Sequence, residues 1–113
     1  MIDAHIHLQD IADEKHGALI ECLRANNISP VFCNGIVPAD WTRVLALSQQ
    51  TGAFPFIGVH PWFVDALSND WEDGLTALLK QHRCGVGEIG LDRGPKGKNF
   101  KKQILVFSRQ VEL

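Results

Sequence analysis

The chain has 113 residues, with 11 lysines and arginines against 13 aspartates and glutamates, and 45% of its residues are apolar. This length and composition fit one ordinary folded domain, and they exclude two domains as well as a disordered chain. The net charge of −2 excludes a general attraction to nucleic acid or anionic membranes, so any such contact needs a local basic cluster or a bound metal.

The first elements of the chain have clear periodic patterns. Residues 2–8, with the sequence IDAHIHL, alternate apolar and polar side chains, which predicts a strand with Asp3, His5 and His7 on its polar face. Residues 13–26 have an apolar stripe at helical spacing that is stopped by turn-forming residues, so they predict a helix.

The strand and helix pattern then recurs three times. Short apolar runs predict strands over 31–33, 56–59 and 85–89. Each run is followed by a stripe typical of a helix: one from Trp41 to near Gly52, one capped by Ser68, Asn69 or Asp70, and one lined by Phe100, Ile104, Phe107 and Val111. The sequence therefore predicts four βα units.

Strands spaced by the length of a βα unit predict an α/β fold with a parallel sheet and right-handed crossovers. Two architectures fit. Length favours a small open doubly wound sheet, whereas the motifs favour the first half of an eight-stranded barrel, which needs about 250 residues in all. The last helix has no stop signal after Leu113, so we interpret residues 1–113 as one partial domain, truncated after its fourth βα unit.

The HxH pair on the first strand has the spacing of metal ligands. His5 and His7 project from one strand face about 6 to 7 Å apart at the backbone, from which two ring nitrogens can converge on one cation. Asp3, on the same face, is a candidate orienting carboxylate or extra ligand. The alternative is that these histidines are ordinary, partly buried polar residues.

Two further candidates come from later strands. Glu88 lies in the apolar fourth strand, where a carboxylate needs a cation to compensate its burial, unless it reaches solvent or an arginine. His60 follows the third strand. Because sites in parallel α/β folds form at the carboxyl ends of strands, the first, third and fourth strands point polar groups to one region.

These residues carry a family resemblance. The segments IDAHIHL (2–8), GVHP (58–61) and GEIGLD (87–92), followed by Gln103, Phe107 and Gln110, resemble the successive N-terminal motifs of the TatD family of metal-dependent hydrolases. The order and spacing of the three segments are far more specific than any one of them, and together they span nearly the whole chain.

The resemblance implies a TIM-barrel hydrolase, typically a nuclease that cleaves DNA phosphodiesters with divalent metal ions such as Mg²⁺, Mn²⁺ or Zn²⁺. By position it implies that His5 and His7 bind the first metal, that Glu88 bridges the metals, and that the catalytic residues His60 and Asp92 lie in or near the site. The family's remaining ligands come from the second half of the barrel, so we expect this chain alone to lack full activity. Four strands also leave two open edges, which favour self-association.

Other features have competing interpretations. The basic residues of one loop and the helix after it lie beside Glu88 and Asp92 and are either a phosphate contact or a solvated surface: Arg93, Lys96, Lys98, Lys101 and Lys102. Trp41 and Trp71 fit helix core faces, which leaves Trp62 as a candidate stacking residue. We assign no role to His16 or His82.

The sequence has no apolar segment long enough for a membrane span and no signal peptide, so we expect a cytosolic protein without membrane contact. Its three cysteines are odd in number and widely spaced, and we interpret them as small buried residues: Cys22, Cys33 and Cys84. Two other functions stay open. One is a related barrel hydrolase that acts on ester, amide or phosphotriester bonds, and the other is a non-catalytic fragment.

Overall fold

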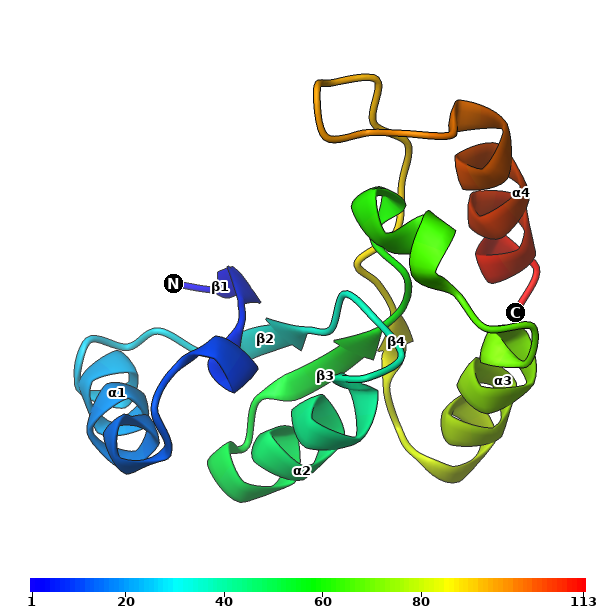
Figure 1. Ribbon diagram of the computed structural model, residues 1–113. Coiled ribbons are helices and arrows are strands. Elements are labelled where there is room, and N and C mark those ends of the chain that lie inside the picture. Colours follow the sequence, from blue (N-terminus) through cyan, green and yellow to red (C-terminus); the bar gives the residue numbers. More distant parts are fainter.

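The computed structural model describes residues 1–113 as four strands and four α-helices that alternate along the chain, with two short 3-10 helices, η1 and η2 (Figure 1). In chain order the elements are β1 (Asp3–Ile6), η1 (Leu8–Asp10), α1 (Asp13–Ala25), β2 (Val31–Asn34), α2 (Trp41–Thr51), β3 (Phe54–Ile57), η2 (Pro61–Ala66), α3 (Trp71–Gln81), β4 (Gly85–Val86) and α4 (Phe100–Val111). The predicted α/β class is confirmed.

The four strands form one sheet in the order β1-β2-β3-β4, and all neighbouring strands are parallel. Sequential order means that the sheet winds in one direction, as in a barrel. A doubly wound sheet would instead grow outward from a central strand. The outer edges of β1 and β4 pair with no further strand.

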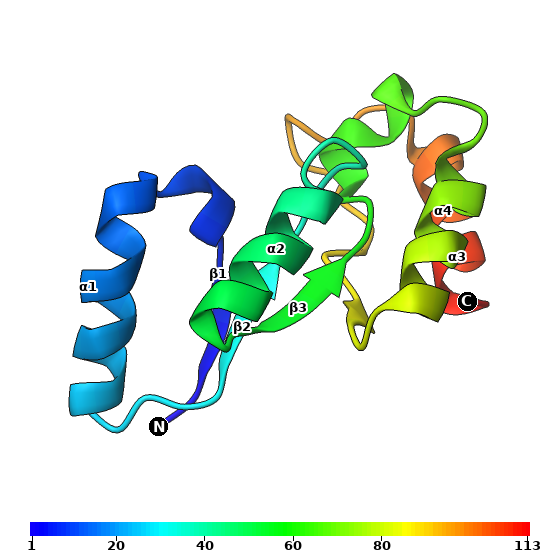
Figure 2. The ribbon, with the colours of Figure 1, turned by 90° about the horizontal axis from the view of Figure 1, so that it is seen from below.

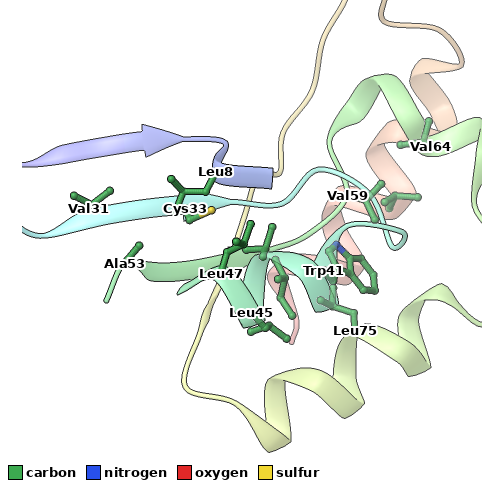
Figure 3. Close-up of a cluster of buried hydrophobic side chains, with 13 residues drawn as sticks. Leu8, Val31, Cys33, Trp41, Leu45, Leu47, Ala53, Val59, Val64 and Leu75 are labelled. Carbon is green, nitrogen blue, oxygen red and sulfur yellow. The ribbon is translucent and has the colours of Figure 1, made fainter. Parts of the chain in front are cut away.

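The core lies between the sheet and α2, which crosses one face of β2 and β3 (Figure 2). Strand residues that point to α2, such as Cys33 and Ile57, are fully buried, and the cluster extends from Leu8 to Leu75 on α3 (Figure 3). On the opposite face of the sheet, Phe32, Phe54 and Phe56 pack edge to face, with ring centroids 5.6 to 6.1 Å apart.

The ends of the first two helices follow from local sequence. Asp13 and Glu14 occupy the first turn of α1, where negative charge interacts favourably with the helix dipole. At the end of α2, Gly52 adopts a left-handed φ of 77° and its N–H bonds to the carbonyl oxygen of Ser48. Both helices match the predicted ranges.

The strands, in contrast, are placed differently from the prediction. The first and fourth are shorter, at Asp3–Ile6 instead of 2–8 and Gly85–Val86 instead of 85–89, and the third is displaced, at Phe54–Ile57 instead of 56–59. Burial does not stop where strand pairing stops, because Val59 is 1% exposed although it lies beyond β3. Apolar character therefore misplaces the strand ends, and the candidate residues His7, His60 and Glu88 lie in the loops just after the strands.

The apolar stripe predicted for the fourth helix is wrong at two of its four positions, while Phe100 and Phe107 are half-buried. Ile104 is 44% exposed and Val111 is 63% exposed, while the buried positions of α4 are Gln103, Val106 and Gln110. The cause is that α4 packs on η2 and on the loops after β3 and β4, whose backbone polar groups need hydrogen-bond partners.

The cysteines do not share one environment. Cys33 is buried and Cys84 is partly buried, but Cys22 is exposed, so the prediction of three buried thiols is wrong for Cys22. It lies two positions from the buried Ile20, on the other side of α1. None of the helices combines the length and apolar character that crossing a bilayer requires.

Candidate metal centre

Three candidate ligands from the first and last strands meet at the carboxyl end of the sheet. His5 lies within β1, His7 follows it, and Glu88 lies two residues beyond β4. Their facing atoms are 3.0 Å apart from His5 Nε2 to His7 Nε2, 3.3 Å from His5 Nε2 to Glu88 Oε2, and 3.6 Å from His7 Nε2 to Glu88 Oε2. The sequence prediction that these strand ends converge agrees with this geometry.

The meeting of these side chains depends on curvature of the sheet. β1 and β4 are its two edges, and in a flat sheet three strand spacings would separate their backbones by about 14 Å. The side chains touch because the sheet curls around the site, as barrel strands do.

The triangle of donor atoms fits a divalent ion. Edges of 3.0, 3.3 and 3.6 Å place the three corners about 1.9 Å from a common centre, close to the bond lengths of about 2.0 to 2.2 Å that imidazole and carboxylate ligands make to zinc. Two imidazole nitrogens and one carboxylate oxygen are also a common donor set for catalytic sites. The residues present therefore fit the metal that the sequence motifs imply.

His7 is held in the tautomer that a ligand needs. Its Nδ1 atom lies 2.7 Å from the backbone carbonyl oxygen of Asn34, which can only accept a hydrogen bond. Nδ1 must therefore carry the proton, which leaves a lone pair on Nε2 in the neutral ring. The Gln9 amide also donates to this carbonyl, at 2.8 Å.

Asp3 lies apart from the three ligands. Its Oδ1 atom accepts a hydrogen bond of 3.1 Å from the backbone N–H of His5, so the carboxylate braces β1. The group of side chains whose ligand atoms lie within 4.8 Å of one another consists of His5, His7 and Glu88. Asp3, considered from the sequence as an orienting carboxylate or an extra ligand, is thus outside this group and contacts the backbone of His5.

His60 faces the same carboxylate from the third strand end. Its Nε2 lies 3.6 Å from Glu88 Oε1, and its Nδ1 accepts the backbone N–H of Trp62 at 3.2 Å. Because Nδ1 accepts, the proton of the neutral ring is on Nε2 and points toward Glu88. Burial lowers the pKa of His60, and the nearby carboxylates of Glu88 and Asp92 oppose this shift.

Asp92 contacts Trp62 and is not among the residues that line a cavity beside the three ligands. Its Oδ2 accepts the indole N–H of Trp62, and its Oδ1 accepts the backbone N–H of Gly94 at 2.6 Å. These two donors, the indole first, lower the pKa of the Asp92 carboxyl. Asp92 is thus ionised at neutral pH, with both oxygens already engaged.

A cavity of about 260 Å³ is lined by two of the three ligands, His7 and Glu88. Its lining combines the polar atoms described above with apolar walls: His7, Ile36, His60, Trp62, Phe63 and Glu88. Trp62 is 43% exposed, and Lys96 Nζ lies 4.6 Å from the centroid of its ring. The cavity is therefore lined by the carboxylate of Glu88 and by an aromatic wall, the ring of Trp62, which the ammonium group of Lys96 contacts.

Several contributors to the site were not identified from the sequence. The backbone of Asn34 and the side chains of Gln9, Ile36 and Phe63 have no motif of their own. The rule that sites form at strand ends would have indicated Asn34, because it is the last residue of β2. Gln9 and Phe63 lie in the 3-10 helices, which the periodicity did not predict.

The remaining candidates lie away from the three ligands. Trp41 is 2% exposed and part of the core, as predicted. His16 is buried on α1 and its Nε2 bonds to the carbonyl of Leu8 at 2.8 Å, whereas His82 is exposed at the end of α3. Of the basic residues around the loop, Arg93 stacks on Phe100 at 4.3 Å and only Lys96 contacts a residue that lines the cavity.

Comparison with known proteins places this geometry in context. The family model described as TatD related DNase matches residues 2–113. The crystal structure of YjjV, a TatD homologue from Escherichia coli K12, superposes with a TM-score of 0.85 at 24% sequence identity, over 99% of this chain and 45% of that chain. This likeness shows the fold, and the chain spans less than half the length of that protein. The search of curated proteins gave no match.

Proposed function

This chain belongs to the TatD family of DNase-related proteins, and we propose that it is part of a divalent-metal-dependent hydrolase that cleaves phosphodiester bonds in DNA. Family membership supports a hydrolase of the nuclease type. The observation that carries the residue assignment is the triangle of His5, His7 and Glu88, with edges between 3.0 and 3.6 Å. Because the chain covers 45% of the matched structure, the activity, substrate and partners of a whole protein are part of this proposal.

In the proposed site, His5, His7 and Glu88 hold the ion, and the negative charge of Glu88 compensates part of the charge of the cation. A divalent ion bound by these residues would supply Lewis-acid chemistry for a phosphoryl oxygen and for an attacking water. Three protein ligands leave room for water or substrate in the remaining positions, which is the arrangement of catalytic zinc sites. We therefore assign about one ion to each chain.

His60 and Asp92 have different roles in this proposal. His60 lines the cavity and presents its Nε2–H, which suits donation of a hydrogen bond to an oxygen of the substrate. Asp92 acts through Trp62, because its carboxylate accepts the indole N–H and thereby orients the aromatic wall. We assign His60 as a catalytic residue and Asp92 as a positioning residue.

With a divalent ion bound at Glu88, an anionic, partly apolar substrate would suit the cavity. The aromatic wall of Trp62 offers a stacking surface for a base, and Lys96 above it supplies positive charge for a phosphate. The net charge of −2 provides no such attraction over the whole molecule, so the local cation matters. These features support a phosphodiester over a neutral ester or amide as the substrate.

A metal titration tests the proposed centre. Isothermal titration of the chain with Mg²⁺, Mn²⁺ or Zn²⁺ in turn is expected to give a stoichiometry near one ion, and His7→Ala is expected to abolish binding. His82→Ala is the matched control, because it removes an exposed imidazole at the end of α3 and leaves the three ligands intact. Equal metal binding by wild type and His7→Ala would refute the assignment.

A substrate comparison tests the reaction class. With each metal supplied, turnover of a phosphodiester is expected to exceed turnover of a carboxylic ester or a phosphotriester. A preference for the ester or the triester would favour a related barrel hydrolase. Metal binding without any turnover would identify the chain as a non-catalytic piece of the family fold.

Self-association belongs to the same proposal. The outer edges of β1 and β4 have no neighbouring strand, and both strands are parallel to the rest of the sheet. The β4 edge of one copy can pair in parallel with the β1 edge of a second copy, which gives unpaired backbone groups their partners. We propose a second copy of this chain as the partner at these edges.

A further inference from the structure

Two buried glutamines on α4 stand out among the residues without an assigned role. Gln103 has no exposed surface and Gln110 is 2% exposed, although glutamine is usually a surface residue. The two positions are seven residues apart, so they lie on the same face of the helix, two turns from each other. A buried amide is costly unless its polar atoms are hydrogen-bonded, which makes its partners informative.

Gln110 binds the backbone at the end of the third strand. Its Oε1 accepts the N–H of Val59 at 2.6 Å, and its Nε2 donates to the carbonyl oxygen of Val59 at 3.3 Å. Both main-chain groups of Val59 therefore pair with one side chain. Val59 directly precedes His60, so this contact fixes the backbone from which the His60 ring projects.

Gln103 makes the equivalent contacts in the loop after β4. Its Oε1 accepts the N–H of Asp92 at 2.8 Å, and its Nε2 donates to the carbonyl oxygens of Asp92 at 3.0 Å and Lys98 at 2.9 Å. The amide thus closes residues 92–98 into a compact loop. Without such a contact, the stretch between β4 and α4 has no strand or helix to hold it.

The helix that carries both amides is itself fixed to its surroundings. At its first turn, Asn99 donates to the carboxylate of Asp65 in η2 at 2.9 Å. Near its end, Arg109 pairs with Glu72 of α3 at 2.9 Å. Figure 1 shows α4 beside η2, with the loop that leads into α4 at the top of the view. The helix can therefore hold two loops at a set distance from each other.

We propose that α4 is the positioning element of the candidate centre, in which Gln110 sets the position of His60 and Gln103 sets the position of the Asp92 carboxylate that orients Trp62. Both glutamines are positioning residues and contact neither the three ligands nor the cavity. The inference rests on the proposed function only in taking His60 and Trp62 as residues of the site. Their geometry can be measured without metal and without turnover.

Nuclear magnetic resonance of the ¹⁵N-labelled metal-free chain tests the separate roles of Gln110 and Gln103. Gln110→Met is expected to speed hydrogen exchange of the Val59 amide roughly tenfold and to shift the His60 ring signals, while the Asp92 amide signal stays in place. Gln103→Met is expected to do the reverse, shifting the Trp62 indole N–H and the Asp92 amide and sparing Val59. Gln50→Met, on the exposed side of α2, is the matched control and should move none of these signals.

The two variants are thus expected to affect different sets of signals, and we call this difference the crossed pattern. It distinguishes positioning by each glutamine from a general loss of stability, which would affect all of the signals. The proposal would be overturned if both variants changed all four signals equally or changed none of them. These signals are the Val59 amide, the His60 ring, the Trp62 indole N–H and the Asp92 amide. If a methionine variant fails to fold, Gln103→Glu and Gln110→Glu replace it, because they keep an acceptor for the backbone N–H and remove the donor. Because the Val59 amide then keeps its acceptor, the expected difference lies in signal positions alone: Gln110→Glu shifts the His60 ring signals and spares the Asp92 amide, whereas Gln103→Glu shifts the Asp92 amide and spares Val59. Absence of this difference would again overturn the proposal.

A separate metal titration of the wild-type chain keeps this inference distinct from the proposed function. Failure of Mn²⁺ to bind would refute the metal centre and leave the crossed pattern of signals standing. Loss of the crossed pattern with normal Mn²⁺ binding would refute the role of α4 alone.

Discussion

The Nδ1 atom of His7 lies 2.7 Å from the backbone carbonyl oxygen of Asn34. A main-chain atom of the neighbouring strand thus orients one of the candidate ligands, so the contact depends on the register between β1 and β2. The side chain of Asn34 takes no part in it, since its amide donates to the carbonyl of Phe32 at 3.4 Å.

Asn34→Ala therefore provides the first prediction. Loss of a side chain that orients a ligand typically lowers metal affinity roughly 10- to 100-fold. Because the carbonyl at position 34 remains, we expect Asn34→Ala to lower Mn²⁺ affinity by less than this range, as measured by calorimetric titration. Loss of binding as complete as that of His7→Ala would show that the side chain, and not the main chain, positions the ring.

The second prediction concerns pH and the contact between Trp62 and Asp92. The indole N–H, with the Gly94 N–H, holds the pKa of the Asp92 carboxyl below its usual value. A carboxyl whose pKa is lowered by folding stabilises the native state above its unfolded pKa, and this contribution is lost as pH falls through the folded pKa. Trp62→Phe removes the indole donor, so the pKa of Asp92 should rise toward its usual range.

The expected signature is a stability difference that depends on pH. Trp62→Phe should be less stable than wild type at pH 7, and the part of the difference that comes from Asp92 should shrink at an acidic pH below the ordinary pKa of aspartate. Urea unfolding at both pH values measures this, and carboxyl NMR titration of Asp92 reports the shift directly. Identical titration of Asp92 in the two proteins would contradict the contact.

The sequence predicts elements best where local chemistry decides them. The range of α2 follows from its apolar stripe and from Gly52, whose positive φ ends the helix. The convergence of His5, His7 and Glu88 follows from the strand pattern, because the carboxyl ends of parallel strands share one edge of the sheet. Both depend on short-range periodicity and on a general rule of topology, whereas the distances between the three side chains also depend on the curvature of the sheet and on the loops that carry His7 and Glu88.

The sequence predicts poorly where loops decide the outcome. The buried face of α4 contains Gln103 and Gln110 in place of the expected apolar residues, because its partners are unpaired backbone groups of Val59 and Asp92. Hydrophobic periodicity contains no information about such groups. The place of Asp92 behind Trp62 likewise depends on a loop conformation that no local pattern specifies.

The third prediction tests the core beneath the site. Leu75 on α3 is fully buried in the cluster that includes Trp41 (Figure 3). Leu75→Ala should reduce the free energy of unfolding by about 2 to 5 kcal/mol, because it removes buried apolar groups and leaves a cavity. Leu105→Ala, at a position that is 62% exposed on α4, should change it by less than about 0.5 kcal/mol. Urea denaturation compares the two, and equal effects would contradict this description of the core.

The fourth prediction concerns the open edges of the sheet. If a second copy pairs with them, sedimentation equilibrium should give a mass near twice the 12.6 kDa of one chain, with a fraction that rises with concentration. Ile2→Lys places a charge beside the β1 edge at a residue that is 60% exposed, so it should shift the equilibrium toward the single chain. Leu113→Lys, at an exposed residue after α4, should leave the equilibrium unchanged. A single-chain mass at every concentration would exclude pairing at these edges, and an equal response to both lysines would place the contact elsewhere.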